Sequence, residues 1–191
     1  MFTDIIPGWL AKVESLSLFD QIKSYNYKGC IGVEIGSLHG KSAAIIAQAI
    51  PLGTLYCIDL WDERDLYNGK FSDLIVEQHN LPRRGMRNSL ELFREYTKNY
   101  NNIQAIKGTS PYCVKNWHQS VDFVFLDAGH TNPNDRDNID FWLLKIKPGG
   151  LLIGHDLKPQ LPDVQKNVKY LSNLLNQDPV IVKTLWSFKI G

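Results

Sequence analysis

Side chains that can bind a charged ligand or move a proton stand where predicted strands end. Glu34, Asp59 and Asp127 each close an apolar run, and His155 and Asp156 follow a further one. The carboxyl ends of parallel strands meet at one edge of a sheet, where such sheets bind ligands. Carboxylates there can accept hydrogen bonds from ammonium or ribose hydroxyl groups, and with imidazole they can hold a divalent cation. The spacing therefore predicts a charged crevice at one sheet edge.

The elements that must position these residues alternate between strand and helix. Apolar runs predict strands over residues 30–35, 54–60, 103–107, 121–127 and 151–156, and one or two short strands over 180–190. Helical spacing predicts helices after Gly40, over residues 88–100 and after Pro162. Two further helices are predicted from the spacing of Ile139, Trp142, Leu143 and Ile146 and from that of Trp9, Val13 and Leu16. This order predicts an α/β fold with a doubly wound, mostly parallel sheet, helices on both faces and an antiparallel C-terminal edge.

Length and composition favour one domain over residues 1–191 with a small-molecule partner. The chain has 191 residues, of which 43% are hydrophobic, and a formal charge of +1, which gives no broad field for nucleic acid or an anionic membrane. The three cysteines are widely spaced and predict reduced thiols, and no run suits a membrane span. We therefore expect a cytoplasmic protein without nucleic-acid or membrane partners. Its oligomeric state is open, with a homodimer as one possibility.

The first predicted turn favours a cofactor that carries positive charge. Gly36 and Gly40 allow a tight strand-to-helix turn that brings a ligand close to backbone N–H groups, but the G-x-G-x-x-G spacing of a nicotinamide dinucleotide site is absent. The Glu34 carboxylate can accept from an ammonium group. Asp59, about 20 residues beyond Gly36, suits the hydroxyls of a ribose. The structural alternatives are an ordinary strand-to-helix turn and an aspartate that caps a loop.

Two stretches resemble a known family. VEIGSLHGKS resembles the first motif of class I S-adenosylmethionine-dependent methyltransferases, E/D-x-G-x-x-x-G, and residues 123–156 resemble a small-molecule O-methyltransferase subgroup with L-D-x-x-H and K-P-G-G…H-D motifs. The resemblance covers about residues 30–157. It implies a Rossmann-like methyltransferase domain, S-adenosylmethionine as cofactor and a small-molecule methyl acceptor. The cofactor residues that it implies are Glu34, Gly36, Ser37, Gly40, Ser42, Asp59, Trp61, Gly108, Thr109, Ser110 and Asp127.

The same resemblance implies candidates for metal binding and catalysis. Some members of the subgroup hold a divalent cation such as Mg²⁺ through the acids that end these two strands, which implies Asp127 and Asp156, with His155 as a third ligand. Imidazole is an unusual ligand for Mg²⁺, so the alternative is that His155 and Asp156 anchor a loop. His130, three residues beyond Asp127, is the candidate general base, and Asp127 joins it in the catalytic pair. A loop histidine bonded to backbone is the alternative.

Residues 61–87 read as an inserted lid, because mixed charge, glycine and proline interrupt every period. Arg83, Arg84 and Arg87 could bind an anionic substrate there, although the pattern favours a solvated basic loop. Two rival functions stay open: a cofactor-binding regulatory domain without turnover, and a nicotinamide-dependent oxidoreductase. The N/D-P-P-Y/F pattern of amino-methyltransferases is missing where LDAGH stands, which disfavours a nucleic-acid base as acceptor.

Overall fold

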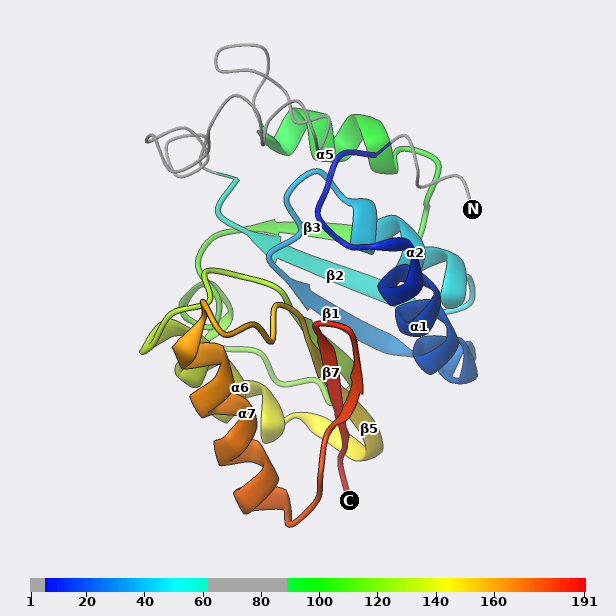
Figure 1. The fold of residues 1–191 in the computed structure, drawn as a ribbon. Helices are drawn as coiled ribbons and strands as arrows, with labels where there is room; N and C mark the ends of the chain where they lie inside the picture. The colour runs from blue at the N-terminus through cyan, green and yellow to red at the C-terminus, as the bar shows by residue number, and fades with distance from the viewer. Residues whose placement is uncertain (1–5, 62–88) are drawn as a thin grey trace.

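Apolar runs form the strands of one seven-stranded sheet in the order β3-β2-β1-β4-β5-β7-β6 (Figure 1). The computed structural model describes residues 6–61 and 89–191. The strands are β1 (Ile31–Ile35), β2 (Thr54–Asp59), β3 (Ile103–Lys107), β4 (Val121–Leu126), β5 (Ile146–Gly154), β6 (Val180–Val182) and β7 (Leu185–Lys189). Strands β1 to β5 pair in parallel, whereas β7 is antiparallel to both β5 and β6. The predicted doubly wound sheet with an antiparallel C-terminal edge is confirmed.

The strand order reverses between β1 and β4. From β1 the chain builds outward through β2 and β3, and it then returns to the other side of β1 to add β4 and β5. Strand β4 is buried along its whole length, as expected of a central strand covered on both faces. The ends of β1 and β4 are in register at Ile35 and Leu126. Ligands of such sheets bind beyond the strand ends at this reversal, so residues 36–40 and 127–135, which follow β1 and β4, are the candidate ligand-binding loops.

Helices cover the sheet on both faces and divide the core in two (Figure 1). Helices α1 (Lys12–Ile22), α2 (Lys41–Ala49) and α5 (Ser89–Thr97) pack on one face, with Phe123 of β4 in that core. Helices α6 (Asn134–Leu143) and α7 (Pro162–Leu175) cover the other face around Trp142. Two short 3-10 helices, η2 (Lys23–Tyr25) and η3 (Tyr112–Val114), complete the described elements. Among the described residues, no helix combines the length and apolar character needed to cross a bilayer.

The buried face of α1 differs from the one that the apolar spacing predicts. Val13 and Leu16 are 51% and 45% exposed, and Trp9 precedes the helix. The helix instead buries Glu14, Ser15, Leu18 and Ile22. The predicted buried face of α1 is wrong because the prediction considered only apolar side chains, whereas this helix directs the side chain of Glu14 toward the protein interior. That acid finds polar partners there, as described below.

Two further boundaries differ from the expected ones. Ile146 begins β5 instead of continuing the face of α6, so KPGG lies inside a strand and not in a turn. The pairing of β4 with β5 shifts register at this point, and a Cβ at Gly150 would lie 2.6 Å from the carbonyl oxygen of Asp122. The glycine is needed because the two backbones approach so closely. Helix α5 ends at Thr97, before Tyr100, and buries Phe93.

Candidate functional site

The parallel strands bring the predicted acidic residues to one edge of the sheet. Asp59 ends β2, Asp127 follows β4, and His155 and Asp156 follow β5, which runs parallel to β4. Glu34 is placed differently, because it lies inside β1, one residue before its end, and is completely buried. The edge therefore carries carboxylates from three strands, with a fourth carboxyl group directly beneath it.

Glu34 is a buried acid that lacks a hydrogen-bond partner on either carboxylate oxygen. Burial raises its pKa to about 7, although the hydroxyl groups of Ser37 and Ser42 and the thiol of Cys57 lie close enough to oppose part of that rise. The buried hydroxyl of Ser37 also has no partner. An unsatisfied buried polar group costs about 1–3 kcal/mol, so two of them side by side indicate a ligand that brings polar hydrogens. The ammonium group of the expected cofactor fits this requirement.

The glycines of the first turn are required by contacts within the protein. Gly36 has a φ of +87°, and a Cβ there would lie 2.1 Å from the carbonyl oxygen of Asp127. Gly40 has a φ of +92°, and its Cβ would meet the side chain of Thr97 at 2.6 Å. The tight turn between β1 and α2 is thus confirmed. Its glycines let the turn approach the end of β4 and helix α5, whatever ligand is present.

Asp59 ties the first turn to the end of β2. Its Oδ2 accepts from the backbone N–H of Leu38 at 2.9 Å, and its Oδ1 accepts from that of Trp61 at 2.7 Å. Burial raises its pKa, and these backbone hydrogen bonds oppose that rise. The aspartate therefore caps a loop, as the structural alternative holds. Each carboxylate oxygen has a further lone pair, so the carboxylate can still accept from ribose hydroxyls.

Trp61 and Ser110, two of the implied cofactor residues, point their side chains into the protein. The indole N–H of Trp61 donates to the carbonyl oxygen of Leu38 at 2.8 Å, and its ring packs on Phe93 with centroids 4.9 Å apart. The hydroxyl of Ser110 accepts from the indole of Trp142 at 3.1 Å. Their side chains therefore stabilise the loops beside the site and are not directed toward a ligand.

Other members of the implied cofactor set are placed as follows. Ser42 is buried at the start of α2, and Gly108 has a φ of +151° with Cys113 where a Cβ would point. Thr109, between β3 and η3, is exposed, and its carbonyl oxygen accepts from the backbone N–H of Cys113. The assignment of these residues to a cofactor stays a prediction. The remainder of the predicted lid, with Arg83, Arg84 and Arg87, lies outside the described residues.

His130, rather than His155, groups with Asp127 and Asp156 in an arrangement that could bind a metal ion. Its Nε2 lies 3.3 Å from Oδ2 of Asp156 and 3.7 Å from Oδ1 of Asp127. Within the described part of the chain these three residues form a group whose ligand atoms lie within 4.8 Å of one another. Atoms bound to one cation at about 2.1 Å are about 3–4 Å apart, so the spacing fits. Two carboxylates and one imidazole suit Mn²⁺ or Zn²⁺ better than Mg²⁺.

His155 is surrounded by acidic groups instead. Its Nδ1 lies 3.2 Å from Oδ1 of Asp127 and 3.3 Å from Oδ1 of Asp156, while its Nε2 lies 3.5 Å from Glu14. Burial disfavours the charged ring, but the three carboxylates outweigh burial and raise the pKa of His155 to about 9. An imidazolium has no free lone pair for a metal ion. The contacts therefore favour His130 as the third ligand of any cation, and the use of a metal stays a prediction.

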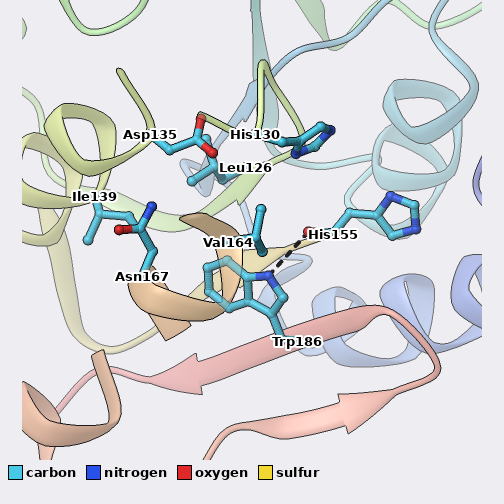
Figure 2. Close-up of a pocket in the computed structure, with 8 residues that line it drawn as sticks. All are labelled: Leu126, His130, Asp135, Ile139, His155, Val164, Asn167 and Trp186. Carbon is cyan, nitrogen blue, oxygen red and sulfur yellow. Dashed lines mark hydrogen bonds between the residues drawn. The ribbon is translucent and has the colours of Figure 1, made fainter. Parts of the chain in front are cut away.

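A small pocket lies beneath this cluster (Figure 2). Figure 2 shows Asp135 with its carboxyl group turned inward, and the indole N–H of Trp186 donating to the carbonyl oxygen of His155 at 3.3 Å. Asp135 is buried, its Oδ1 has no partner, and burial raises its pKa to about 6. The pocket thus offers one carboxyl group beside two imidazole rings, an amide and apolar side chains. Its lining residues are Leu126, His130, Asp135, Ile139, His155, Val164, Asn167 and Trp186.

Sequence reasoning missed Glu14, Thr184 and Asp135. Glu14 and Thr184 are separated by 170 positions, and neither belongs to a motif, so no local pattern could identify them. A weak signal existed for Glu14, because Glu14, Leu18 and Ile22 follow helical spacing once acids are allowed on the buried face. Asp135 lies in a run of polar residues whose buried member cannot be recognised without coordinates.

Comparison with known proteins agrees with this geometry. A family model described as "Methyltransferase domain" matches residues 33–157. A putative rRNA-methylase from Clostridium thermocellum is 13% identical with a TM-score of 0.68, covering 96% of this chain and 99% of that one. A putative O-methyltransferase from Klebsiella pneumoniae is 15% identical with a TM-score of 0.66, covering 97% and 84%. A putative methyltransferase from Streptococcus mutans in complex with SAH is 13% identical with a TM-score of 0.63, covering 94% and 97%. At these identities the structural likeness concerns the fold.

Proposed function

Because this chain belongs to the methyltransferase-domain family, we propose that it uses S-adenosylmethionine to methylate an oxygen atom of a small molecule. The observation that carries the proposal is the convergence of Asp127, His130 and Asp156 beside the turn after β1, which Glu34 of β1 precedes and Asp59 of β2 caps. A cofactor site and a proton acceptor are thus neighbours at the reversal of strand order. A neighbour described as an O-methyltransferase supports the oxygen acceptor by analogy of fold.

The proposal gives the first turn and β2 the task of holding the cofactor. The unpartnered carboxyl group of Glu34 and hydroxyl of Ser37 accept from its ammonium group, and the remaining lone pairs of Asp59 accept from its ribose hydroxyls. When bound, S-adenosylmethionine supplies an electrophilic methyl group whose bond to sulfur breaks as the bond to the acceptor oxygen forms. Alignment by residues held rigidly at strand ends can lower the barrier by about 7–11 kcal/mol.

His130 is assigned to remove the acceptor's proton. A hydroxyl must lose its proton as its oxygen attacks, and imidazole is the side chain best suited to accept a proton near neutral pH. Asp127 and Asp156 lie beside Nε2 of His130, where their negative charges stabilise the imidazolium that forms. Because Nε2 carries its proton toward these carboxylates, the acceptor oxygen is expected to approach Nδ1, the ring nitrogen that keeps its lone pair. Asp127 then acts in catalysis through His130.

The same three residues would hold a divalent cation if one is used. Such a cation would act as a Lewis acid that lowers the pKa of a coordinated acceptor hydroxyl. A cation on Nε2 of His130 would replace the proton that faces these carboxylates, so the two roles exclude each other. We favour the base, because the ring of His155 already contributes positive charge between Asp127 and Asp156.

Calorimetry with S-adenosylhomocysteine tests the cofactor site. Wild-type protein should bind it with micromolar affinity, and Asp59→Ala should abolish that binding, because the variant loses both the ribose acceptor and the cap on the turn. Asp20→Ala is the matched control, since this exposed acid of α1 pairs with Lys23, which begins η2. Circular dichroism establishes that each variant is folded. Unchanged affinity in folded Asp59→Ala would remove the ribose assignment.

Methyl transfer tests the reaction itself. Incubation with methyl-labelled cofactor and a panel of phenols, sugars and hydroxy acids should label at least one hydroxyl compound, and His130→Gln should lower that rate at least 100-fold. The rival regulatory domain predicts cofactor binding without labelled product. A nicotinamide oxidoreductase predicts NAD binding by fluorescence, which the spacing of the glycines in the first turn opposes.

A further inference from the structure

Helix α1 and the turn between β6 and β7 meet at the buried ring of His155. Oε1 of Glu14 accepts from the backbone N–H of Thr184 at 2.9 Å and from its hydroxyl at 2.5 Å, and Oε2 accepts from the N–H of Ala11 at 3.0 Å. The hydroxyl oxygen of Thr184 also lies 3.1 Å from Nε2 of His155. Glu14 and His155 are 1% and 4% exposed. These contacts join the two ends of the described chain behind the candidate site.

The hydrogen-bond inventory determines which atoms carry protons. Burial opposes the charged form of Glu14, but hydrogen bonds from Thr184 and Ala11 outweigh it and hold the pKa of Glu14 below its usual value. As a carboxylate, Glu14 only accepts, so the single hydroxyl proton of Thr184 points to it. The oxygen of Thr184 is then left to accept from Nε2–H of His155. Nδ1 faces two carboxylate oxygens and must also carry a proton.

The ring of His155 in turn contacts the carboxylates of Asp127 and Asp156 at the sheet edge. Nδ1–H of His155 lies between Oδ1 of Asp127 and Oδ1 of Asp156, at 3.2 and 3.3 Å. With Oδ1 of Asp156 held there, Oδ2 of the same residue faces Nε2 of His130 at 3.3 Å. Rotation of the His155 ring would release Asp127, whereas Asp156 would keep the ammonium group of Lys158, whose Nζ lies 2.5 Å from the same Oδ1. The orientation of the groups beside the candidate base therefore depends on contacts made on the far side of His155.

We propose that Glu14 and Thr184 are positioning residues for methyl transfer: they fix the ring of His155, which holds Asp127 and Asp156 in the orientation that His130 requires. This inference rests on the proposed function for its kinetic consequence. It also accounts for the acid on the buried face of α1, which would otherwise be a costly choice. Neither residue touches the acceptor or the cofactor, so the effect passes through His155.

A matched pair at position 184 and one variant at position 14 isolate this role. Thr184→Val removes the hydroxyl at nearly constant volume, whereas Thr184→Ser keeps it. Glu14→Gln keeps the side-chain length but places an NH₂ group opposite the N–H of Ala11 or the hydroxyl of Thr184, where it cannot accept. Long-range ¹H–¹⁵N spectra at pH 7.5, assigned with His155→Gln, report the order and hydrogen bonding of the ring without any need for an acceptor.

The expected spectra show one sharp set of His155 ring signals in wild type and Thr184→Ser, and a shifted, broadened Nε2 signal in Thr184→Val and Glu14→Gln, because the ring loses the hydrogen-bond arrangement that fixes it on that side. With a labelled acceptor, the latter two should lose at least tenfold in kcat while the affinity for S-adenosylhomocysteine stays within twofold. An unchanged His155 spectrum, or an unchanged kcat, in both folded variants would overturn the proposal. Should Thr184→Val fail to fold, Glu14→Gln decides. A wild type without methyl transfer would refute the proposed function, while the spectra would still judge whether Glu14 and Thr184 hold the ring.

Discussion

Glu34→Gln should remove a pH dependence from cofactor binding. Burial raises the pKa of Glu34 to about 7, so the free protein holds this group protonated in mild acid. An ammonium partner binds only the ionised carboxylate. Binding at pH 5 to 6 must therefore release a proton, and the affinity must weaken as pH falls.

The magnitude follows from the ionised fraction. With a pKa of about 7, roughly half of the Glu34 groups are ionised at pH 7 and about 1 in 100 at pH 5. The affinity for S-adenosylhomocysteine should then fall about 50-fold between these pH values, which corresponds to ~2.3 kcal/mol. The cofactor's own ammonium group stays charged over this range. Glutamine cannot ionise, so the variant should bind more weakly at pH 7 and with little dependence on pH.

Isothermal titration calorimetry at pH 5, 6 and 7 measures both quantities. Repeating each titration in two buffers of different ionisation enthalpy gives the number of protons released, which should approach one at pH 5 in wild type and zero in Glu34→Gln. Asp135, whose pKa burial raises to about 6, is a second group that could titrate here, and its contribution would survive in the variant. A flat wild-type profile, or an equal slope in both proteins, would refute the pairing of Glu34 with the ammonium group.

The remaining predictions concern stability and metal use. Gly36→Ala should lose more than ~4 kcal/mol of unfolding free energy in urea, because its Cβ meets backbone, whereas Gly29→Ala, with a φ of +91° and open space, should lose only ~1–2; equal losses would contradict the packing argument. Asp122→Asn should cost about 2–3 kcal/mol at pH 7, since Asp122 is buried with Lys147 at 2.9 Å. Although burial opposes it, hydrogen bonding lowers the pKa of Asp122, so this difference should fade as pH falls below the ordinary aspartate range, as urea titration at several pH values would measure. Chelation with EDTA should leave the methyl-transfer rate within twofold; inactivation reversed by Mn²⁺ would assign His130 to a cation instead.

The sequence predicted the fold best where one local pattern is enough to determine an element and its position. The unbroken apolar run of β4 predicts a strand covered on both faces, and strands that run in parallel must deliver their last residues to one edge. The positions of Asp59, Asp127 and Asp156 at that edge follow directly from these two rules. The tight turn after β1 could likewise be predicted, because two glycines separate the strand from an apolar helix.

Side-chain direction could not be predicted in the same way. His155 directly precedes Asp156 and His130 lies three residues after Asp127, yet His130 has a φ of +56° and its ring lies toward Asp156 across the loop. His155 keeps its ring inside, where Glu14 faces it from a helix 141 positions earlier. The choice between the two histidines depends on contacts that no local spacing records. The same holds for α1, whose buried acid requires a partner from the other end of the chain.

The glycine motif of the first turn therefore says less about function than the polar groups beside it. The missing Cβ of Gly36 makes room for the backbone of Asp127, and that of Gly40 makes room for α5, so both glycines would be needed in a protein that binds nothing at this edge. Glu34 and Ser37 have no such explanation, since the nearby hydroxyl and thiol groups offset only part of the cost of burying the Glu34 carboxyl group, and none of these oxygens has a hydrogen bond of normal geometry. A protein without a ligand here would be more stable with apolar side chains at both positions. The unsatisfied carboxyl and hydroxyl groups, more than the spacing of the glycines, are the reason to expect a cofactor at this turn.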